Sequence, residues 1–252
     1  MITTDITGRR IAITGAGRGL GEAMAVAFAD QGAELILLGR TAATLSATRD
    51  TITRRTGRAP LAVACDLADT ASVAAAAGSL AAQLDRLDAL INNGAFWLPG
   101  PLADLTTEDI VQVVNSQITG AALLTQRLAP LLLKSAAPDI VNIVSTSGVV
   151  NTRLLGASVP FYAAKHGQTG LTNGLRQEMA GTPIRVIGVY PPDIEDLSPL
   201  DGAAWNAAAA QPKAAKINER NVVEAVQFAI TRPRNCTIAT IVLDSDAGGT
   251  YQ

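Results

Sequence analysis

The chain has few of the residues that build metal centres or disulfide frameworks. It contains a single histidine, His166, and two cysteines, Cys65 and Cys236, which stand far apart within apolar runs. Free cysteines in such surroundings are mostly small buried thiols. A protein-built zinc site needs a full set of nitrogen and sulfur ligands, so we expect no metal site.

Charge of one sign and long apolar segments are also lacking. The formal net charge of the 252 residues is −2, with acidic and basic residues interspersed, so we expect no nucleic-acid partner. No uncharged apolar run approaches the roughly 18 residues of a membrane span. The polar residues 1–8 lack the apolar core of a secretory signal. These absences predict a cytoplasmic protein that acts on a small molecule without a membrane partner.

Glycine is present in a concentrated form near the start of the chain. Residues 11–13 are typical of a buried parallel strand, residues 22–30 of a helix, and residues 35–38 of a second strand. Four glycines stand at every second position from 15 to 21. Such a turn lets the backbone approach a phosphate, whose charge is stabilised by the free N–H groups of the helix start. The alternative is a plain turn that closes a βαβ unit.

The spacing of these glycines carries a family resemblance. Leu20 stands where a strict G-x-G-x-x-G needs its last glycine, but Thr14, Gly15, Gly19 and Gly21 form the pattern T-G-x-x-x-G-x-G. This pattern resembles the short-chain dehydrogenase/reductase family, in which the loop holds the pyrophosphate of a nicotinamide dinucleotide. The resemblance implies that Gly15, Gly19, Leu20 and Gly21 bind the cofactor.

The end of the second strand indicates which dinucleotide is bound. Folds that bind NAD usually place an acid there to bond the ribose 2′-hydroxyl, but here the strand ends at Gly39 and Arg40. Arg40, with Arg18 in the glycine loop, can form paired bonds to a 2′-phosphate. The alternative is two exposed arginines without a ligand. We expect NADP(H) in preference to NAD(H).

The rest of the chain alternates between strands and helices. Strands are expected at 61–65, 89–91, 140–145, 184–190 and 237–243, and helices at 41–56, 70–84, 107–134, 161–179 and 222–231. This order predicts one α/β domain over residues 1–252, a doubly wound Rossmann-type fold with about seven parallel strands and helices on both faces. Residues 193–216, rich in proline, alanine and aspartate, are expected to form a substrate lid.

Two of these elements indicate further contacts. The segment 107–134 is apolar on more than one face, which predicts burial by something beyond its own sheet. Because the resembling family commonly pairs this helix across subunits, we expect a homodimer or homotetramer.

The resemblance extends to the ends of the later strands. It implies that Asp66, with Leu67 beside it, caps an adenine pocket, although Asp66 alternatively begins a turn. Asn93 and Gly94 belong to a segment that is Asn-Asn-Ala-Gly in the family, with the last two residues exchanged here. After the sixth strand the family has a Pro-Gly segment, which implies cofactor contacts at two further residues, namely Pro191 and Ile194. Pro192 replaces its glycine, and Asp196 replaces a threonine.

The family reduces carbonyl groups with serine, tyrosine and lysine, assisted by a helical asparagine that holds a water. Ser145, three residues before Gly148, matches the serine, with Ser147 as second choice, and Lys165 matches the lysine, which in the family also binds the nicotinamide ribose. The other two positions depart from the pattern: Phe161 occupies the tyrosine position and Gln117 the asparagine position.

Tyr162, one residue after Phe161, is a candidate for the missing phenol. A helix turns about 100° per residue, so Tyr162 should face away from the direction of Phe161. However, Tyr162 and Lys165 are three residues apart and share a helix face. A local shift after the long loop 149–160 would therefore pair them.

These features lead to alternative functional hypotheses. In the first, the protein is an NADPH-dependent reductase of a small apolar or cyclic carbonyl or imine, because an iminium already carries the positive charge that a protonated carbonyl needs. In the second, it binds the nucleotide without redox chemistry, as an isomerase, lyase, cyclase or binding protein. In the third, Phe161 is an engineered Tyr-to-Phe change. Apolar loop residues are candidates for substrate contacts, namely Trp97, Leu98, Leu154, Leu155 and Trp205.

Overall fold

Seven parallel strands form one sheet in the computed structural model, which describes residues 5–150, 152–154 and 156–247. The strand order is β3-β2-β1-β4-β5-β6-β7, and each pair of neighbours is parallel. This confirms the doubly wound Rossmann-type α/β fold. The strands are β1 (Arg10–Thr14), β2 (Glu34–Gly39), β3 (Leu61–Ala64), β4 (Ala89–Asn92), β5 (Asp139–Ile143), β6 (Arg185–Tyr190) and β7 (Thr240–Val242).

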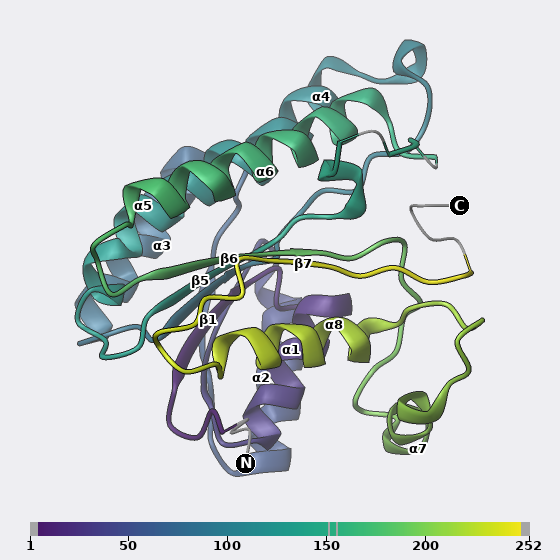
Figure 1. Ribbon diagram of the computed structural model, residues 1–252. Coiled ribbons are helices and arrows are strands. Elements are labelled where there is room, and N and C mark those ends of the chain that lie inside the picture. Colours follow the sequence, from purple (N-terminus) through teal and green to yellow (C-terminus); the bar gives the residue numbers. More distant parts are fainter. Residues whose placement is uncertain (1–4, 151, 155, 248–252) are drawn as a thin grey trace.

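Helices cover both faces of the sheet (Figure 1). One layer contains α1 (Gly19–Asp30), α2 (Ala42–Thr56) and α8 (Glu219–Ile230). The other contains α3 (Thr70–Gln83), α4 (Thr107–Val114), α5 (Gly120–Leu132) and α6 (Val159–Glu178). The short helix α7 (Gly202–Ala207) lies outside these layers, next to the α8 side.

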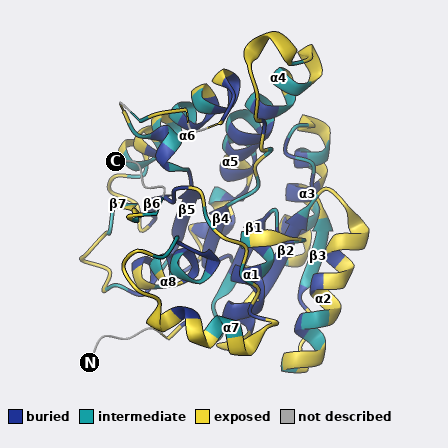
Figure 2. Ribbon diagram, turned by 90° about the vertical axis from the view of Figure 1, so that its right-hand side faces the viewer, coloured by how far each residue is buried: buried dark blue, intermediate teal, exposed yellow. Residues whose placement is uncertain are grey.

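Alternation along each strand divides the core between the two helical layers. Ile11 and Ile13 of β1 pack in a cluster with α1 and α8, whereas Ala12 between them packs in a cluster with α3 and α5. Since both faces of the sheet are covered, the central strands are buried throughout, as Figure 2 shows. This explains why the strands have continuous apolar sequences instead of alternating ones.

The single helix expected over 107–134 is wrong in detail. A π-helical turn, Asn115–Thr119, separates α4 from α5, while Pro130 lies inside α5 without ending it. A π turn holds an extra residue, which rotates the following helix by about 100° relative to a regular continuation. If residues 107–134 formed one regular helix, the apolar residues before and after the turn would lie on different faces. In the actual structure the two sets both face the interior. This accounts for part of the apolarity that a subunit interface was expected to explain.

The two cysteines differ in their surroundings. Cys65 is buried, as expected, but Cys236 is exposed, so the expectation of burial is wrong there. The last strand starts at Thr240 and not at 237, which leaves Cys236 in the turn before it, where its N–H bonds the Pro233 carbonyl.

The described part of the chain lacks two features, a metal-binding cluster and a membrane-spanning helix. It contains no cluster of three or more His, Cys, Asp or Glu side chains arranged to bind a metal ion. None of its helices is both long enough and apolar enough to cross a membrane.

The segment 193–216 is more ordered than a simple loop. It contains α7 and a short 3₁₀ turn, Ala208–Ala210. A hydrogen bond of 2.8 Å from the Glu195 N–H to the Ile217 carbonyl holds the start and the end of the segment close together. That this segment covers a substrate stays a prediction.

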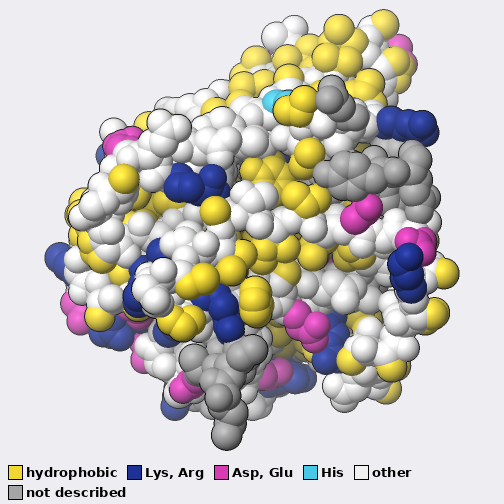
Figure 3. Space-filling view, viewed as in Figure 1, with side chains coloured by type: hydrophobic (Ala, Val, Ile, Leu, Met, Phe, Trp, Pro, Cys, Tyr) yellow, Lys and Arg dark blue, Asp and Glu magenta, His cyan; other side chains and the backbone are white. Residues whose placement is uncertain are grey.

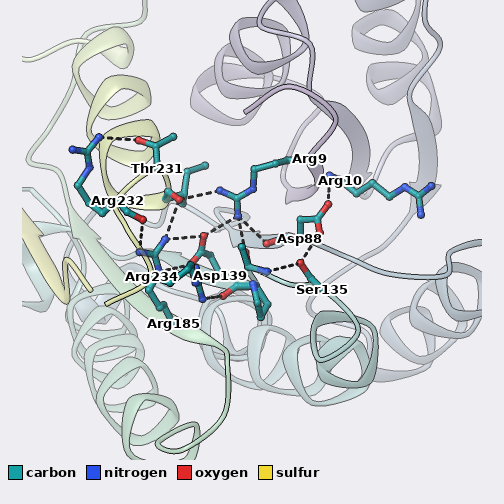
Figure 4. A network of polar contacts seen from close by, with 12 residues as sticks. Arg9, Arg10, Asp88, Ser135, Asp139, Arg185, Thr231, Arg232 and Arg234 are labelled. Atoms are coloured by element: carbon teal, nitrogen blue, oxygen red, sulfur yellow. Dashed lines mark hydrogen bonds and ion pairs between the residues drawn. The ribbon is translucent and has the colours of Figure 1, made fainter. Parts of the chain in front are cut away.

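At the amino ends of the strands, one carboxylate links distant parts of the fold (Figure 4). Asp139, the first residue of β5, is fully buried and accepts bonds of 2.8 Å from Arg9, Arg185 and Arg234. The guanidinium groups of Arg9 and Arg185 also donate to the carbonyl oxygen of Ile230 at the end of α8. The carboxylate therefore connects β1, β5, β6 and α8.

We expect Asp139→Asn to lower the free energy of unfolding by roughly 3–5 kcal/mol, because it leaves three guanidinium groups without their shared negative charge. Urea unfolding measures this change. Asp30→Asn is the matched control, since Asp30 pairs with Arg55 at the surface and its loss should cost less than about 1 kcal/mol. Equal losses for the two variants would contradict the central role of Asp139.

Candidate active site

The carboxyl ends of β1 and β4 lie side by side and are joined by one threonine. The Thr14 hydroxyl oxygen accepts the N–H groups of Asn93 and Gly94 at 2.9 and 2.8 Å, and the Asn93 side chain donates to the Thr14 carbonyl at 3.0 Å. Strands β2 and β3 follow on one side of β1, whereas β4 to β7 follow on the other side. Doubly wound sheets bind ligands at the point where the strand order reverses in this way.

The glycine loop fits only because it lacks side chains. Gly15 has a φ of +68°, in the left-handed region that favours glycine. A Cβ on Gly21 would lie 2.1 Å from the Gly15 carbonyl oxygen, so any side chain there would displace the loop. Helix α1 begins at Gly19, and the preceding residue, Arg18, gives no side-chain cap. The first N–H groups of α1 are thus available to an anion.

A cavity of about 270 Å³ extends from this loop past the ends of β2 and β3. Of the residues predicted to bind a cofactor, the structure brings seven together in its lining, namely Gly15, Arg18, Arg40, Asp66, Leu67, Asn93 and Gly94. Lining residues that the sequence analysis missed include Thr41, Thr44, Cys65 and Gln112. Thr41 directly follows Arg40 and Thr44 is four residues after it, and this closeness in sequence is the only signal that pointed to them.

The two arginines of the expected 2′-phosphate site lie on the rim of the cavity. Arg18 and Arg40 are both exposed, and in the described ranges neither guanidinium forms an ion pair. Asp66 has the role of a turn residue, since its carboxylate accepts the Ala68 N–H at 2.9 Å before α3. Its contact with an adenine stays a prediction.

The catalytic candidates lie farther along the same edge of the sheet. Ser145 follows β5, and its hydroxyl oxygen accepts the N–H of Ser147 at 3.1 Å. The next residue, Thr146, donates its N–H to the Pro191 carbonyl at 2.9 Å, which ties the loops after β5 and β6 together. Ile194, three residues after Pro191, packs on the α1–α8 side of the core.

Lys165 is buried in α6 and pairs with no carboxylate in the described part of the chain. The residue is 3% exposed, and its Nζ donates to the Gln168 side-chain oxygen at 2.8 Å and to the Ile143 carbonyl at 3.5 Å. Burial lowers the pKa of the ammonium to about 7, because the charged form loses its hydration. Lys165 therefore exchanges a proton near neutral pH.

Phe161, and not Tyr162, faces this lysine. The Lys165 Nζ lies 5.5 Å from the centre of the Phe161 ring, which also packs edge-on against Trp97 at 4.7 Å between centroids. The Tyr162 hydroxyl donates instead to the Thr152 carbonyl at 2.9 Å. The shift that would pair Tyr162 with Lys165 does not occur, because α6 begins at Val159 and is already regular at both positions.

Gln117 lies in the π turn between α4 and α5 and is fully buried. Its side-chain nitrogen donates to the Phe96 carbonyl at 3.1 Å, while its Oε1 has no hydrogen-bond partner among the described protein groups. An unpaired buried oxygen costs about 1–3 kcal/mol, so it is a ready acceptor for a ligand or a water. Turns of this kind are frequent at functional sites.

The predicted apolar contacts are only partly brought together. Leu98 and Phe161 share a small apolar cluster, and the half-exposed Trp97 packs edge-on against Phe161. Trp205 instead packs on the α1–α8 side of the sheet. Leu155 lies outside the described residues.

Apolar side chains also gather on the surface near this site. Figure 3 shows them over the end of the molecule that carries α4, and exposed examples there are Leu102 and Val111.

Comparison with known proteins agrees with this geometry. The family model of the short chain dehydrogenases matches residues 9–206. The chain belongs to this family. The protein is accordingly an NAD(P)-dependent oxidoreductase of the short-chain type, as the glycine pattern implied.

Similar proteins cover nearly the whole chain. D-threitol dehydrogenase of Mycolicibacterium smegmatis is 29% identical over 96% of this chain and 88% of its own length. Ketoacyl reductase HetN of a Nostoc species is 28% identical over 95% of this chain and 80% of its own length.

Solved structures of this family have the same fold. A structure described as a short chain dehydrogenase of Escherichia coli CFT073 complexed with NADPH has a TM-score of 0.79 and 25% identity, over 95% of this chain and 98% of the other. A metagenomic short-chain oxidoreductase in complex with NADP has a TM-score of 0.76 and 25% identity, over 95% and 97% of the two chains.

The buried lysine should give the ligand-free protein a measurable pH dependence. Between about pH 7 and pH 10, Lys165 is neutral in the folded protein but protonated in the unfolded chain, so stability rises with pH. Relative to Lys165→Met, the wild-type free energy of unfolding should rise by up to about 1.4 kcal/mol per pH unit in this window.

Urea unfolding at pH 7.5 and 9.5 tests this expectation. Lys134→Met, at an exposed lysine, is the control and should follow the wild type. Identical pH slopes for Lys165→Met and the wild type would show that Lys165 is charged when folded.

Proposed function

We propose that the protein is an NADPH-dependent reductase of a small apolar or cyclic substrate with a C=N or an activated C=O bond. The observation that carries this proposal is the placement of Phe161 against the buried Lys165, beside a glycine cradle whose rim carries two unpaired arginines. The cradle favours a phosphorylated dinucleotide, and the missing phenol favours a substrate that needs no strong acid.

The shape of the cradle supports binding of a dinucleotide. The approach of Gly15 and Gly21 leaves only backbone N–H groups at the start of α1, which suits a pyrophosphate. The guanidinium groups of Arg18 and Arg40 would bond a 2′-phosphate. The similar structures solved with NADPH or NADP support this choice of nucleotide. When bound, the reduced nicotinamide supplies a hydride.

The chain's own groups would act on the substrate as follows. Trp97, Leu98 and Phe161 offer an apolar surface that orients a ring and excludes water. The Ser145 hydroxyl donates a hydrogen bond to the heteroatom of the double bond, where electron density develops. Lys165, deeper in the site, binds ribose hydroxyl groups.

The proton requirement differs between substrates. A carbonyl oxygen becomes an alkoxide during reduction and needs a proton, which a tyrosine would supply. An iminium is already cationic and becomes a neutral amine, so Phe161 imposes no comparable penalty. The Tyr162 hydroxyl is engaged with Thr152 and has no part in this proposal.

Two wider features belong to the same proposal. Residues 193–216, which follow β6, would cover the bound substrate. The chain would form a homodimer or homotetramer, for which the exposed Val111 on α4 and Leu133 beside α5 provide apolar surface.

Arg40→Ala should remove the preference for NADPH over NADH, because it deletes the guanidinium expected to pair with the 2′-phosphate. The wild type should bind NADPH at least about tenfold more tightly, since each charge-assisted bond contributes about 1.5–3 kcal/mol. Fluorescence titration of both nucleotides measures this difference. Arg49→Ala, at an exposed arginine on α2, serves as control, and equal wild-type affinities would end the proposal of a 2′-phosphate site.

Phe161→Tyr should raise the reduction of simple ketones by roughly 10²–10⁴-fold, because it places a phenol next to Lys165. Reduction of a cyclic iminium should change far less. Tyr162→Phe is the control and should alter neither rate. Turnover of model ketones and imines with NADPH gives the comparison, and no gain with ketones would indicate a site adapted to other chemistry.

A further inference from the structure

An acid that the sequence analysis did not single out is buried beside the glycine loop. Glu219 is the first residue of α8 and is 3% exposed. Its backbone N–H bonds the Glu195 carbonyl, so the start of α8 is fixed to the segment that follows β6. Its carboxyl group is consequently held in place.

The two oxygens of this carboxyl group face two different segments, the glycine loop and the segment after β6. Oε1 lies 3.6 Å from the position that a Cβ on Gly19 would take, at the first turn of α1. Oε2 accepts the N–H of Leu197, in the segment after Pro191, at 3.2 Å. Glu219 thus lies between the glycine loop and the loop that follows β6.

The neighbouring charges are mostly negative. Glu22, in the first turn of α1, and Asp196, in the loop after β6, both act on Glu219 electrostatically. Burial raises the pKa of Glu219 to about 7, and these two carboxylates act in the same direction, while the Leu197 N–H opposes them. Glu195, whose backbone carbonyl bonds the Glu219 N–H, has a carboxylate that acts on Lys216.

The cations next to Glu219 in the chain and in the segment after β6 are engaged elsewhere, and Arg18 stays at the rim of the cavity. Arg220, next in α8, bonds Glu224 and the Trp205 carbonyl, and Lys216 pairs with Asp193. Arg18 precedes α1 on the rim of the cavity. Over residues 5–150, 152–154 and 156–247, no lysine or arginine forms an ion pair with Glu219.

A diphosphate bound at the first turn of α1 would lie close to Glu219, because Oε1 is 3.6 Å from the Cβ position of Gly19. Phosphate oxygens accept hydrogen bonds and carry negative charge, so an ionised carboxylate repels them and a protonated carboxyl group donates to them. We propose that Glu219 binds the diphosphate of the nucleotide in its protonated form, so that nucleotide binding takes up a proton. This inference rests on the proposed nucleotide-dependent function and adds a binding residue to it.

The sign of the pH effect follows from this linkage. Above about pH 7 the free protein has lost the Glu219 proton, and binding must restore it. Affinity should therefore fall as pH rises, by at most tenfold per pH unit for one proton. Below pH 6 the proton is already present and the effect vanishes.

The test is a titration of NADPH from pH 6.0 to pH 8.5 with the wild type, Glu219→Gln and Glu224→Gln. Glutamine keeps a donor without a charge, so Glu219→Gln should bind with little pH dependence and about tenfold more tightly than the wild type at pH 8.5. Glu224→Gln, an exposed acid on the same helix, should follow the wild type. The 2′-phosphate of NADPH titrates near pH 6 in all three proteins and cancels in the comparison.

Calorimetry of the wild type provides a measurement that needs no variant. Titrations at pH 8.0 in two buffers of different ionisation enthalpy should show most of one proton taken up per NADPH bound. If NADPH affinity depends on pH in the same way in the wild type and Glu219→Gln, or if binding takes up no proton, the role of Glu219 is wrong. The proposed function would not be affected by that result. If no protein binds NADPH at any pH, the proposed function fails and this inference with it.

Discussion

Close contact between the ends of β1 and β4 is the constraint on which the rest of the site depends. The Thr14 hydroxyl joins these strand ends, and the glycine loop packs against them so tightly that a Cβ on Gly21 would overlap the Gly15 carbonyl. Because the loop itself carries no side chains at these glycines, its backbone N–H groups are open to the space above the sheet. A phosphate-binding surface follows from this packing without any charged side chain, and the arginines act at its rim.

Buried charged groups have partners of opposite charge at one end of the sheet and lack them at the other end, among the described residues. At the amino end, Asp139 is surrounded by three guanidinium groups that also bond backbone carbonyls, so its charge is compensated within the fold. At the carboxyl end, Lys165 and Glu219 form no ion pair with any described residue, and burial brings the pKa of each to about 7. Charge that is left uncompensated inside a protein shifts pKa values toward the pH at which chemistry occurs. The charged groups that stabilise the fold thus lie at the amino ends of the strands, and those suited to binding or chemistry lie at the carboxyl ends.

Much of this arrangement could be predicted from sequence, but the side-chain directions could not. The glycine spacing, the absence of an acid after β2 and the alternation of elements follow local rules, and they located the fold and the cavity lining. The π turn at Asn115–Thr119 has no comparable local signature, because α4 and the turn itself pack against α6, which lies far along the chain. The exposure of Cys236 was missed because strand ends depend on what they pair with.

The sequence by itself determined the α/β class, the parallel sheet and the family, since short apolar runs, helical patterns and a glycine-rich turn are local properties. Only the tertiary structure decided that Phe161 and not Tyr162 faces Lys165, and that Glu219 lies against the loop at Gly19. Gly19 and Glu219 are about 200 positions apart in the chain. Their contact depends on how α8 packs on the sheet, which no local pattern encodes.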